Sequence, residues 1–150
     1  LVGKTQNKHF LAGIHDYQER IGHYMPFEIN VIPELKNTKN LSESQQKVKE
    51  GELILKELQP ADTVVLMDEH GKELRSIELA KWLQEKQNVS RRLIFVIGGP
   101  YGFSTDVYAR ANEKLSLSKM TFSHQMVRLI MVEQLYRACT IIKGEPYHHE

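Results

Sequence analysis

The sequence has little cysteine and no long apolar segment. Its 150 residues include one cysteine, Cys139, which has no internal disulfide partner and cannot build a cysteine-based metal cluster. We therefore expect a reducing, cytoplasmic environment and no bound metal. No apolar run approaches the roughly 20 residues of a membrane-spanning helix. The N-terminus shows no charged segment followed by an apolar one, so we expect neither a membrane partner nor a secretory signal.

An excess of charge of one sign is also lacking. The chain has 20 Lys+Arg against 19 Asp+Glu, for a formal charge of +1. A protein that binds nucleic acid mainly by neutralising phosphates usually has a basic surplus. Any nucleic-acid partner must therefore be recognised by its shape or by a local basic patch. The length predicts one domain, residues 1–150, and the composition is that of an ordinary globular protein.

Apolar residues at helical spacing and residues typical of helix caps predict five helices. These cover residues 8–24, 42–58, 77–87, 104–112 and 123–142. Ser42 and Gln45 have the spacing of a capping box at the start of the second helix. Gly51 is unfavourable inside that helix and weakens the prediction there.

Short apolar or alternating segments between these helices predict strands at 27–32, 63–67, 93–97 and 115–118, and 1–3 looks like the end of a further strand. The polar residues 68–71 predict a turn. Alternating strands and helices indicate an α/β fold, with a mostly parallel sheet of about five strands flanked by helices. The last helix is apolar nearly all round. It is either a central core helix or one that a partner subunit covers.

Ligands of open α/β sheets bind at the carboxyl ends of the strands. Three predicted strand ends meet this description, at residues 67–69, 98–102 and 117–122. The glycine-rich 98–102 segment does not match the dinucleotide fingerprint, and the chain has no phosphate-binding P-loop motif. Taken alone, this segment is better explained as a tight turn between a strand and a helix that contacts no ligand.

Few titratable residues stand out. His124 and Arg128 are four residues apart at the start of the last helix, so they share one face. A histidine there could act as a general base, or it could simply make a local hydrogen bond. Glu133 and Arg137 have the spacing of a structural ion pair. The His148–Glu150 end has no matching ligand cluster elsewhere in the sequence, and a solvated tail explains it better than a metal site.

Three stretches together carry a more specific resemblance: residues 95–102, residues 115–128, and residues 133–138 with the closing 144–148. The chain resembles the ribosomal RNA large subunit methyltransferase H family, a minimal branch of the SPOUT methyltransferases. This resemblance implies S-adenosylmethionine as cofactor and methylation of N3 of a pseudouridine in a 23S rRNA stem-loop on the assembled ribosome. It also implies a homodimer with a C-terminal trefoil knot.

Carried over by position, the resemblance assigns cofactor contacts to residues at the three strand ends. These are Met67, Gly98, Leu117, Ser118, Lys119, Met120, Thr121 and Phe122. It makes His124 the candidate base and Arg128 a partner for an oxyanion or phosphate. Tyr147 and His148 would position the target base in cis or across the dimer. Two alternatives stay open: a non-catalytic ribosome- or RNA-binding module, and an α/β enzyme that uses another nucleotide.

Overall fold

The computed structural model describes residues 1–149, and the chain divides into two compact units. The sheet unit consists of Leu1–Lys4, Asn30–Lys72 and Ser90–Ser116. The helical unit consists of Thr5–Ile29, Glu73–Val89 and the chain from Leu117 onward. Each unit is thus assembled from three separate stretches of sequence. The expectation of a single domain stays a prediction.

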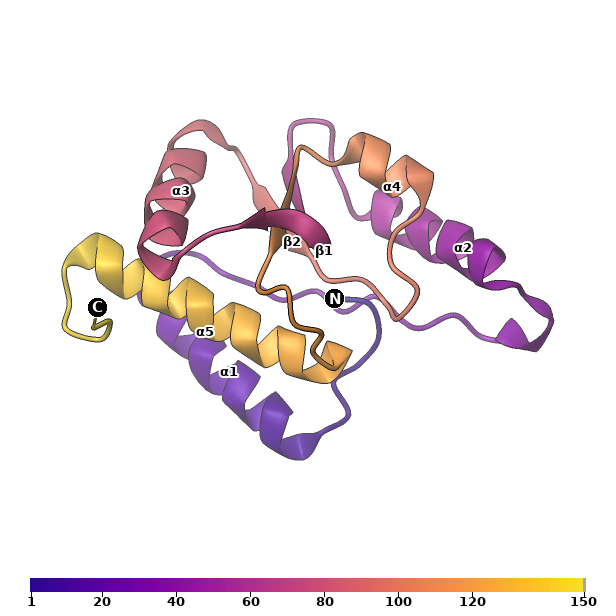
Figure 1. Ribbon diagram of the computed structural model, residues 1–150, viewed down its shortest axis with the longest axis horizontal. Helices are drawn as coiled ribbons and strands as arrows, with labels where there is room; N and C mark the ends of the chain where they lie inside the picture. The colour runs from indigo at the N-terminus through magenta and orange to yellow at the C-terminus, as the bar shows by residue number, and fades with distance from the viewer. Residues whose placement is uncertain (150) are drawn as a thin grey trace. The chain divides into compact units, whose positions relative to one another are not determined.

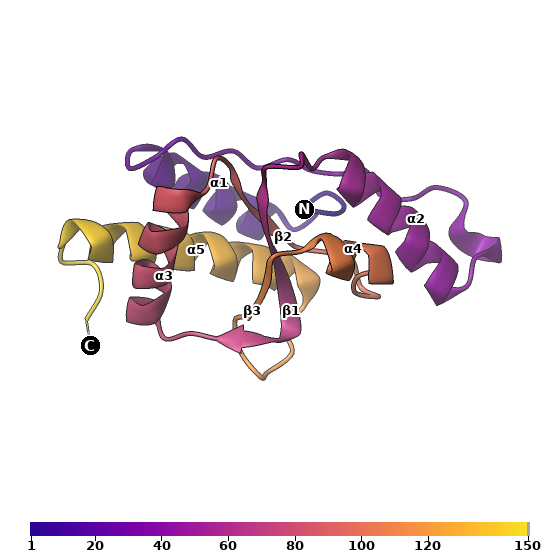
Figure 2. The same cartoon turned by 90° about the horizontal axis from the view of Figure 1, so that it is seen from above.

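The sheet unit contains three strands in the order β2-β1-β3, which Figures 1 and 2 show from two directions. They are β1 (Thr63–Glu73), β2 (Leu93–Val96) and β3 (Glu113–Ser116). β1 and β2 are parallel, and their register runs from Thr63 opposite Leu93 to Leu66 opposite Val96. Val64, Val65 and Leu66 of β1 are apolar and fully buried, as expected for a parallel strand covered on both faces. The α/β class and the parallel pairing are confirmed.

The prediction of about five strands is wrong, because the described residues form three. Residues 1–3 and 27–32 contribute only a single bridge, between Val2 and Ile32. The amide of Gly3 donates to the Ile32 carbonyl at 2.8 Å, and the amide of Val2 donates to the Ile97 carbonyl at 3.1 Å. These segments therefore pair where strands were predicted, but their pairing is too short to count as strands.

The predicted turn at residues 68–71 is also wrong, because β1 continues through them to Glu73. Gly71 explains how the strand continues beside β3. A Cβ atom there would lie only 2.6 Å from the backbone carbonyl carbon of Leu115, so a side chain has no room. Polar composition predicted a turn, yet in this strand it marks the more exposed half.

Helices α2 (Glu43–Lys56) and α4 (Thr105–Arg110) complete the sheet unit, together with the short 3-10 helix η1 (Thr38–Asn40). Ser42 caps α2 in a complete capping box with Gln45, as predicted. The hydrophobic core combines one face of β1 with both helices. Its members are Val2, Ile32, Ile54, Val64, Leu66, Val96, Phe103 and Val107.

The helical unit consists of α1 (Lys8–Gly22), α3 (Ser76–Val89) and α5 (His124–Lys143). α5 packs against both α1 and α3, and Figure 1 shows α1 running alongside it. Met131, Leu135 and Ala138 are buried on α5. Two neighbouring helices of the same chain thus account for much of its apolar surface, and the homodimer stays a prediction. Within residues 1–149, no helix combines the length and apolarity needed to span a membrane.

An ion pair between the partly exposed Arg92 and the buried Asp62 stabilises the start of β1 in the sheet unit. Arg92 donates through Nε to Oδ1 of Asp62 at 2.8 Å and through Nη2 to Oδ2 at 2.6 Å. The amide of Gln59 donates to the same carboxylate at 2.6 Å. Asp62 is only 5% exposed, and Arg92 holds the pKa of its carboxyl below the ordinary value.

We expect Asp62→Asn to lower the free energy of unfolding at pH 7 by about 2 kcal/mol, the scale of hydrogen bonds to a charged group. A lowered carboxyl pKa adds stability above the unfolded-state pKa, and that stability is lost as pH falls through the folded-state pKa. The difference between variant and wild type should therefore shrink between about pH 5 and pH 2, in urea titrations. Asp16→Asn removes an exposed pair and serves as the control. A pH-independent difference would contradict this role of Asp62.

Candidate functional site

Two of the predicted cofactor residues, Met67 and Gly98, lie where the pairing of β1 with β2 ends. Leu66 is opposite Val96 in this pairing; Met67 is the next residue of β1, and Gly98 comes two residues after Val96. Side chains of a strand alternate between faces, so Met67 lies on the face opposite the core residues Val64 and Leu66. Both Met67 and Gly98 are partly exposed. The sheet unit therefore places both residues at the same end of the β1–β2 pairing.

Gly98 can contact a ligand only through its backbone. A Cβ atom at Gly98 would lie 2.8 Å from the Phe103 ring, which is buried in the core. The amide of Gly102 donates to the Gly99 carbonyl at 3.3 Å, and Gly102 has a φ of 81°. The glycine-rich segment is thus a tight turn in which the side-chain space at Gly98 is already filled. What it offers to a ligand is amide and carbonyl groups.

The other cofactor residues, Leu117–Phe122, form the loop before α5 in the helical unit. The Ser118 hydroxyl accepts a hydrogen bond from the Met120 amide at 3.0 Å, which turns the chain. The Met120 side chain is 76% exposed, whereas Leu117 and Phe122 are half-buried. Ser123 then caps α5 by accepting from the Met126 amide at 3.2 Å. This loop combines apolar side chains with exposed backbone.

His124 and Arg128 have different surroundings although they share one face of α5. His124 is exposed at the first residue of the helix. Arg128 is 1% exposed, and its Nη1 donates to Oγ1 of Thr5 at 3.0 Å. The neighbouring Gln6 amide donates to Oε1 of Gln125 at 2.8 Å. In this structure Arg128 therefore holds the segment before α1, while His124 is available to a partner.

Tyr147 and His148 are held against their own α1 and α5 by what we call the tail cluster. It consists of Tyr17, Tyr24, Glu133, Tyr136, Arg137, Glu145, Tyr147 and His148. The Tyr147 hydroxyl donates to Oε1 of Glu133 at 3.1 Å, and the Arg137 guanidinium lies 4.8 Å from the Tyr147 ring centre. Glu133 and Arg137 form the predicted ion pair.

The tail cluster also determines the protonation of its members. Burial raises the pKa of Tyr147, and the Tyr17 hydroxyl and the Glu133 carboxylate raise it further. A hydrogen bond to Glu145 raises the pKa of Tyr24 to about 12. Arg137 Nη1 lies 3.2 Å from Nδ1 of His148. Since arginine can only donate, Nδ1 is the acceptor, and a neutral His148 carries its proton on Nε2.

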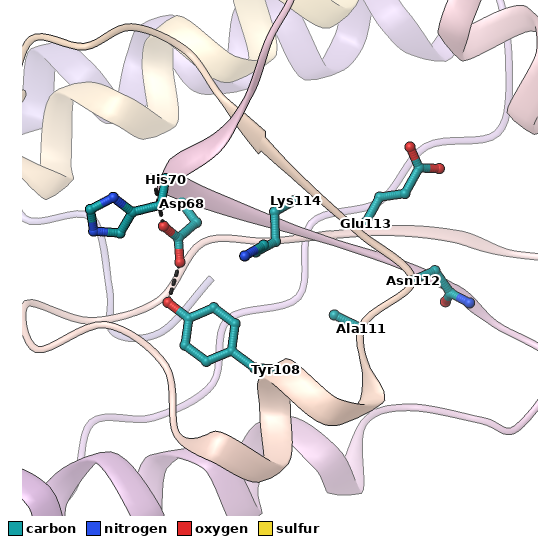
Figure 3. A pocket seen from close by; sticks show the side chains of 7 residues that line it. All are labelled: Asp68, His70, Tyr108, Ala111, Asn112, Glu113 and Lys114. Atoms are coloured by element: carbon teal, nitrogen blue, oxygen red, sulfur yellow. Dashed lines mark hydrogen bonds between the residues drawn. The ribbon is translucent and has the colours of Figure 1, made fainter.

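A pocket of about 370 Å³ lies on β1, α4 and the start of β3. Its lining includes Asp68 and His70, which the sequence had assigned to a turn, together with Tyr108 and Lys114. Figure 3 shows the Tyr108 hydroxyl bonded to the Asp68 carboxylate. Burial and this bond raise the pKa of Tyr108 to about 12, so it remains a donor at neutral pH. Asp68 belongs to the predicted ligand-binding segment 67–69, but none of the residues assigned to the cofactor or to the nucleotide lines this pocket.

Comparison with known proteins gives the family. A family model described as "Predicted SPOUT methyltransferase" matches residues 1–148. The chain belongs to the SPOUT methyltransferase family. This SPOUT methyltransferase is 63% identical over 151 residues to the ribosomal RNA large subunit methyltransferase H of Bacteroides fragilis, a match covering 100% of this chain and 96% of that protein. For the proteins of the same name from Phocaeicola vulgatus and Christiangramia forsetii, the identities are 64% and 60%, over 96% and 95% of those proteins.

Within each unit, the structure brings together some of the predicted site residues of this SPOUT methyltransferase and separates others. Met67 and Gly98 lie at the same end of the β1–β2 pairing, and the Leu117–Phe122 loop leads through Ser123 to His124. The tail residues instead contact α5 at Glu133 and Arg137. Glu133 lies nine residues beyond His124, about 14 Å along a helix axis. Sequence reasoning missed Tyr17 of α1 and Tyr24, which follows α1, as tail contacts, because only the fold brings this part of the chain to the tail.

We expect Glu133→Ala to release the tail, because it removes the acceptor of Tyr147 and the partner of Arg137. The free energy of unfolding should fall by about 1–3 kcal/mol, and amide exchange in residues 145–149 should become faster. Hydrogen exchange read by mass spectrometry measures the second effect. Glu85→Ala, an exposed change on α3, is the control and should leave the tail protected. Unchanged tail exchange in Glu133→Ala would show that the tail cluster does not hold the tail.

Proposed function

We propose that this protein is an S-adenosylmethionine-dependent methyltransferase that modifies N3 of a pseudouridine in a 23S rRNA stem-loop of the assembled ribosome. The observation that carries the proposal is the full-length similarity to proteins named ribosomal RNA large subunit methyltransferase H. We further propose that it acts in the cytoplasm as a homodimer with the trefoil knot of its family. The nearly balanced charge is compatible with recognition of a folded ribosomal surface.

The chemistry of the candidate residues fits S-adenosylmethionine. Adenine is a flat, uncharged ring that needs apolar surface and backbone hydrogen-bonding groups. Met67, Leu117 and Phe122 offer the apolar surface, and the turn after Gly98 offers backbone rather than side chains. When bound, the cofactor supplies a methyl group already activated on a positively charged sulfur. The main contribution of the protein is then alignment, which is worth up to roughly 7–11 kcal/mol in favourable cases.

The helical unit supplies the residues proposed to act on the nucleotide. N3 of a pseudouridine must lose its proton, and we assign the exposed His124 as the residue that accepts it. Arg128 is assigned to stabilise the negative charge that develops on the base, or to bind a nearby phosphate. Because its guanidinium is buried against Thr5, this role requires the segment before α1 to move. Tyr147 and His148 complete the proposed set as residues that position the base.

Mass spectrometry of 23S rRNA tests the activity directly. In cells that lack this protein, we expect one pseudouridine to lose one methyl group. Purified protein with S-adenosylmethionine should restore the methyl group on assembled ribosomes from these cells. Ribosomes that bind the protein without gaining a methyl group would instead support the non-catalytic binding module. Unchanged rRNA modification in the deletion strain would exclude the proposed substrate.

His124→Ala tests the assignment of the base. We expect the single-turnover methylation rate on ribosomes to fall by roughly 10²–10⁴-fold, the usual contribution of a general base. Affinity for S-adenosylmethionine should change little, because His124 is not among the proposed cofactor contacts. His15→Ala replaces another exposed histidine, on α1, and serves as the control. A full single-turnover rate in His124→Ala would exclude His124 as the general base.

A further inference from the structure

The carboxylate of Glu50, on α2, reaches the glycine turn that follows β2. The amide of Gly99 donates to Oε1 of Glu50 at 3.0 Å, across 49 positions of sequence. Gly99 directly follows Gly98, the proposed cofactor contact, and its carbonyl accepts from the Gly102 amide. A side chain of a distant helix thus holds the backbone of this turn at its second residue.

The glycine at position 99 leaves room for this carboxylate. Its backbone is not among the positive-φ glycines, which are Gly3, Gly102 and Gly144. A Cβ atom at Gly99 would lie 2.7 Å from Oε2 of Glu50 and 3.1 Å from Oε1. The Glu50 carboxylate therefore occupies the space that a side chain at Gly99 would need.

Gly51, the neighbour of Glu50, lies close to Ser104, two residues after the same turn. Gly51 is buried inside α2, where glycine is intrinsically unfavourable. A Cβ atom there would lie 2.4 Å from Oγ of Ser104. Ser104 caps α4 by accepting from the Val107 amide at 3.4 Å. Gly51 thus lets α2 approach the end of the turn closely, which explains the glycine that weakened the helix prediction.

We propose that Glu50 is a positioning residue for S-adenosylmethionine binding, acting through the Gly98–Gly102 turn. The inference rests on the proposed function, in which Gly98 contacts the cofactor through its backbone. On the strand side, the position before Gly98 is fixed by the bond from Val2 to the Ile97 carbonyl. On the loop side, Glu50 fixes the position after it. Without the carboxylate, the turn keeps only one of these two supports.

An uncharged acceptor in the same place should serve almost as well as the carboxylate. Burial raises the pKa of Glu50, the nearby Glu34 carboxylate raises it further, and the Gly99 hydrogen bond acts in the opposite direction. The surroundings of Glu50 therefore disfavour its negative charge, whereas the hydrogen bond from Gly99 needs only an oxygen acceptor. Glutamine has an amide oxygen at the same reach, so Glu50→Gln is the conservative variant that separates the two.

The test is a double-mutant cycle on Glu50→Ala and Gly99→Ala, read by calorimetry with S-adenosylmethionine. We expect Glu50→Ala to raise the dissociation constant about tenfold and Glu50→Gln to stay within about threefold of wild type. Gly99→Ala should also weaken binding, because its Cβ collides with the carboxylate. In the double variant the collision is absent, so its affinity should be better than the product of the two single effects. Glu52→Ala, exposed on the same helix, is the control.

A second measurement reads the contact without any cofactor. The amide proton resonance of Gly99 should shift upfield in Glu50→Ala and stay near its wild-type position in Glu50→Gln. If Glu50→Ala does not fold, Glu50→Gln still gives both readouts, and wild-type affinity in Gly99→Ala would overturn the inference. Additive effects in the cycle, or wild-type affinity in a folded Glu50→Ala protein, would overturn the inference. If wild type fails to bind S-adenosylmethionine while the Gly99 resonance responds as expected, the proposed function fails and the contact stands.

Discussion

The parallel pairing of β1 with β2 is the constraint on which the candidate cofactor site depends. Val64, Val65 and Leu66 are completely buried, so this part of β1 has no freedom to slip relative to its neighbour. The pairing of Leu66 with Val96 then fixes where the pairing of the two strands ends. A shift of one residue would turn Met67 toward the core and change its position relative to Gly98. The position of the site in the sheet unit therefore depends first on the strand register and only then on side-chain chemistry.

Local signals predicted most elements of the fold. The Ser42–Gln45 capping box, Ser104 and Ser123 each begin a helix where the sequence indicated. A hydroxyl that caps a helix acts within three residues, so its effect is written into the local sequence. The buried β1–β2 pair was predictable for the same reason, because a continuous apolar run has few other places to go. The resemblance to the methyltransferase family assigned Met67 and Gly98 as site residues, and both adjoin this predicted pair of strands.

The features that sequence reasoning missed all depend on contacts between distant residues. The polar half of β1 looks like a turn unless the backbone of β3 beside Gly71 is known. The contact between Glu50 and Gly99 spans 49 positions, and nothing near either residue indicates it. The tail cluster likewise joins Tyr17 of α1 to Tyr147 across 130 positions. Sequence periodicity gives the element to which a residue belongs, whereas these roles depend on which elements meet.

The position of the tail constrains how a complete active site can form. Tyr147 and His148 are bonded to Glu133 and Arg137, two to four turns of α5 beyond His124. A single nucleobase is too small to contact both ends of that distance, so one chain in this arrangement cannot present His124 and its own tail to the same base. Either the tail leaves Glu133 and Arg137 on substrate binding, or the tail of a second subunit serves His124. The second solution keeps every bond of the tail cluster, and it gives the proposed homodimer a catalytic reason to exist.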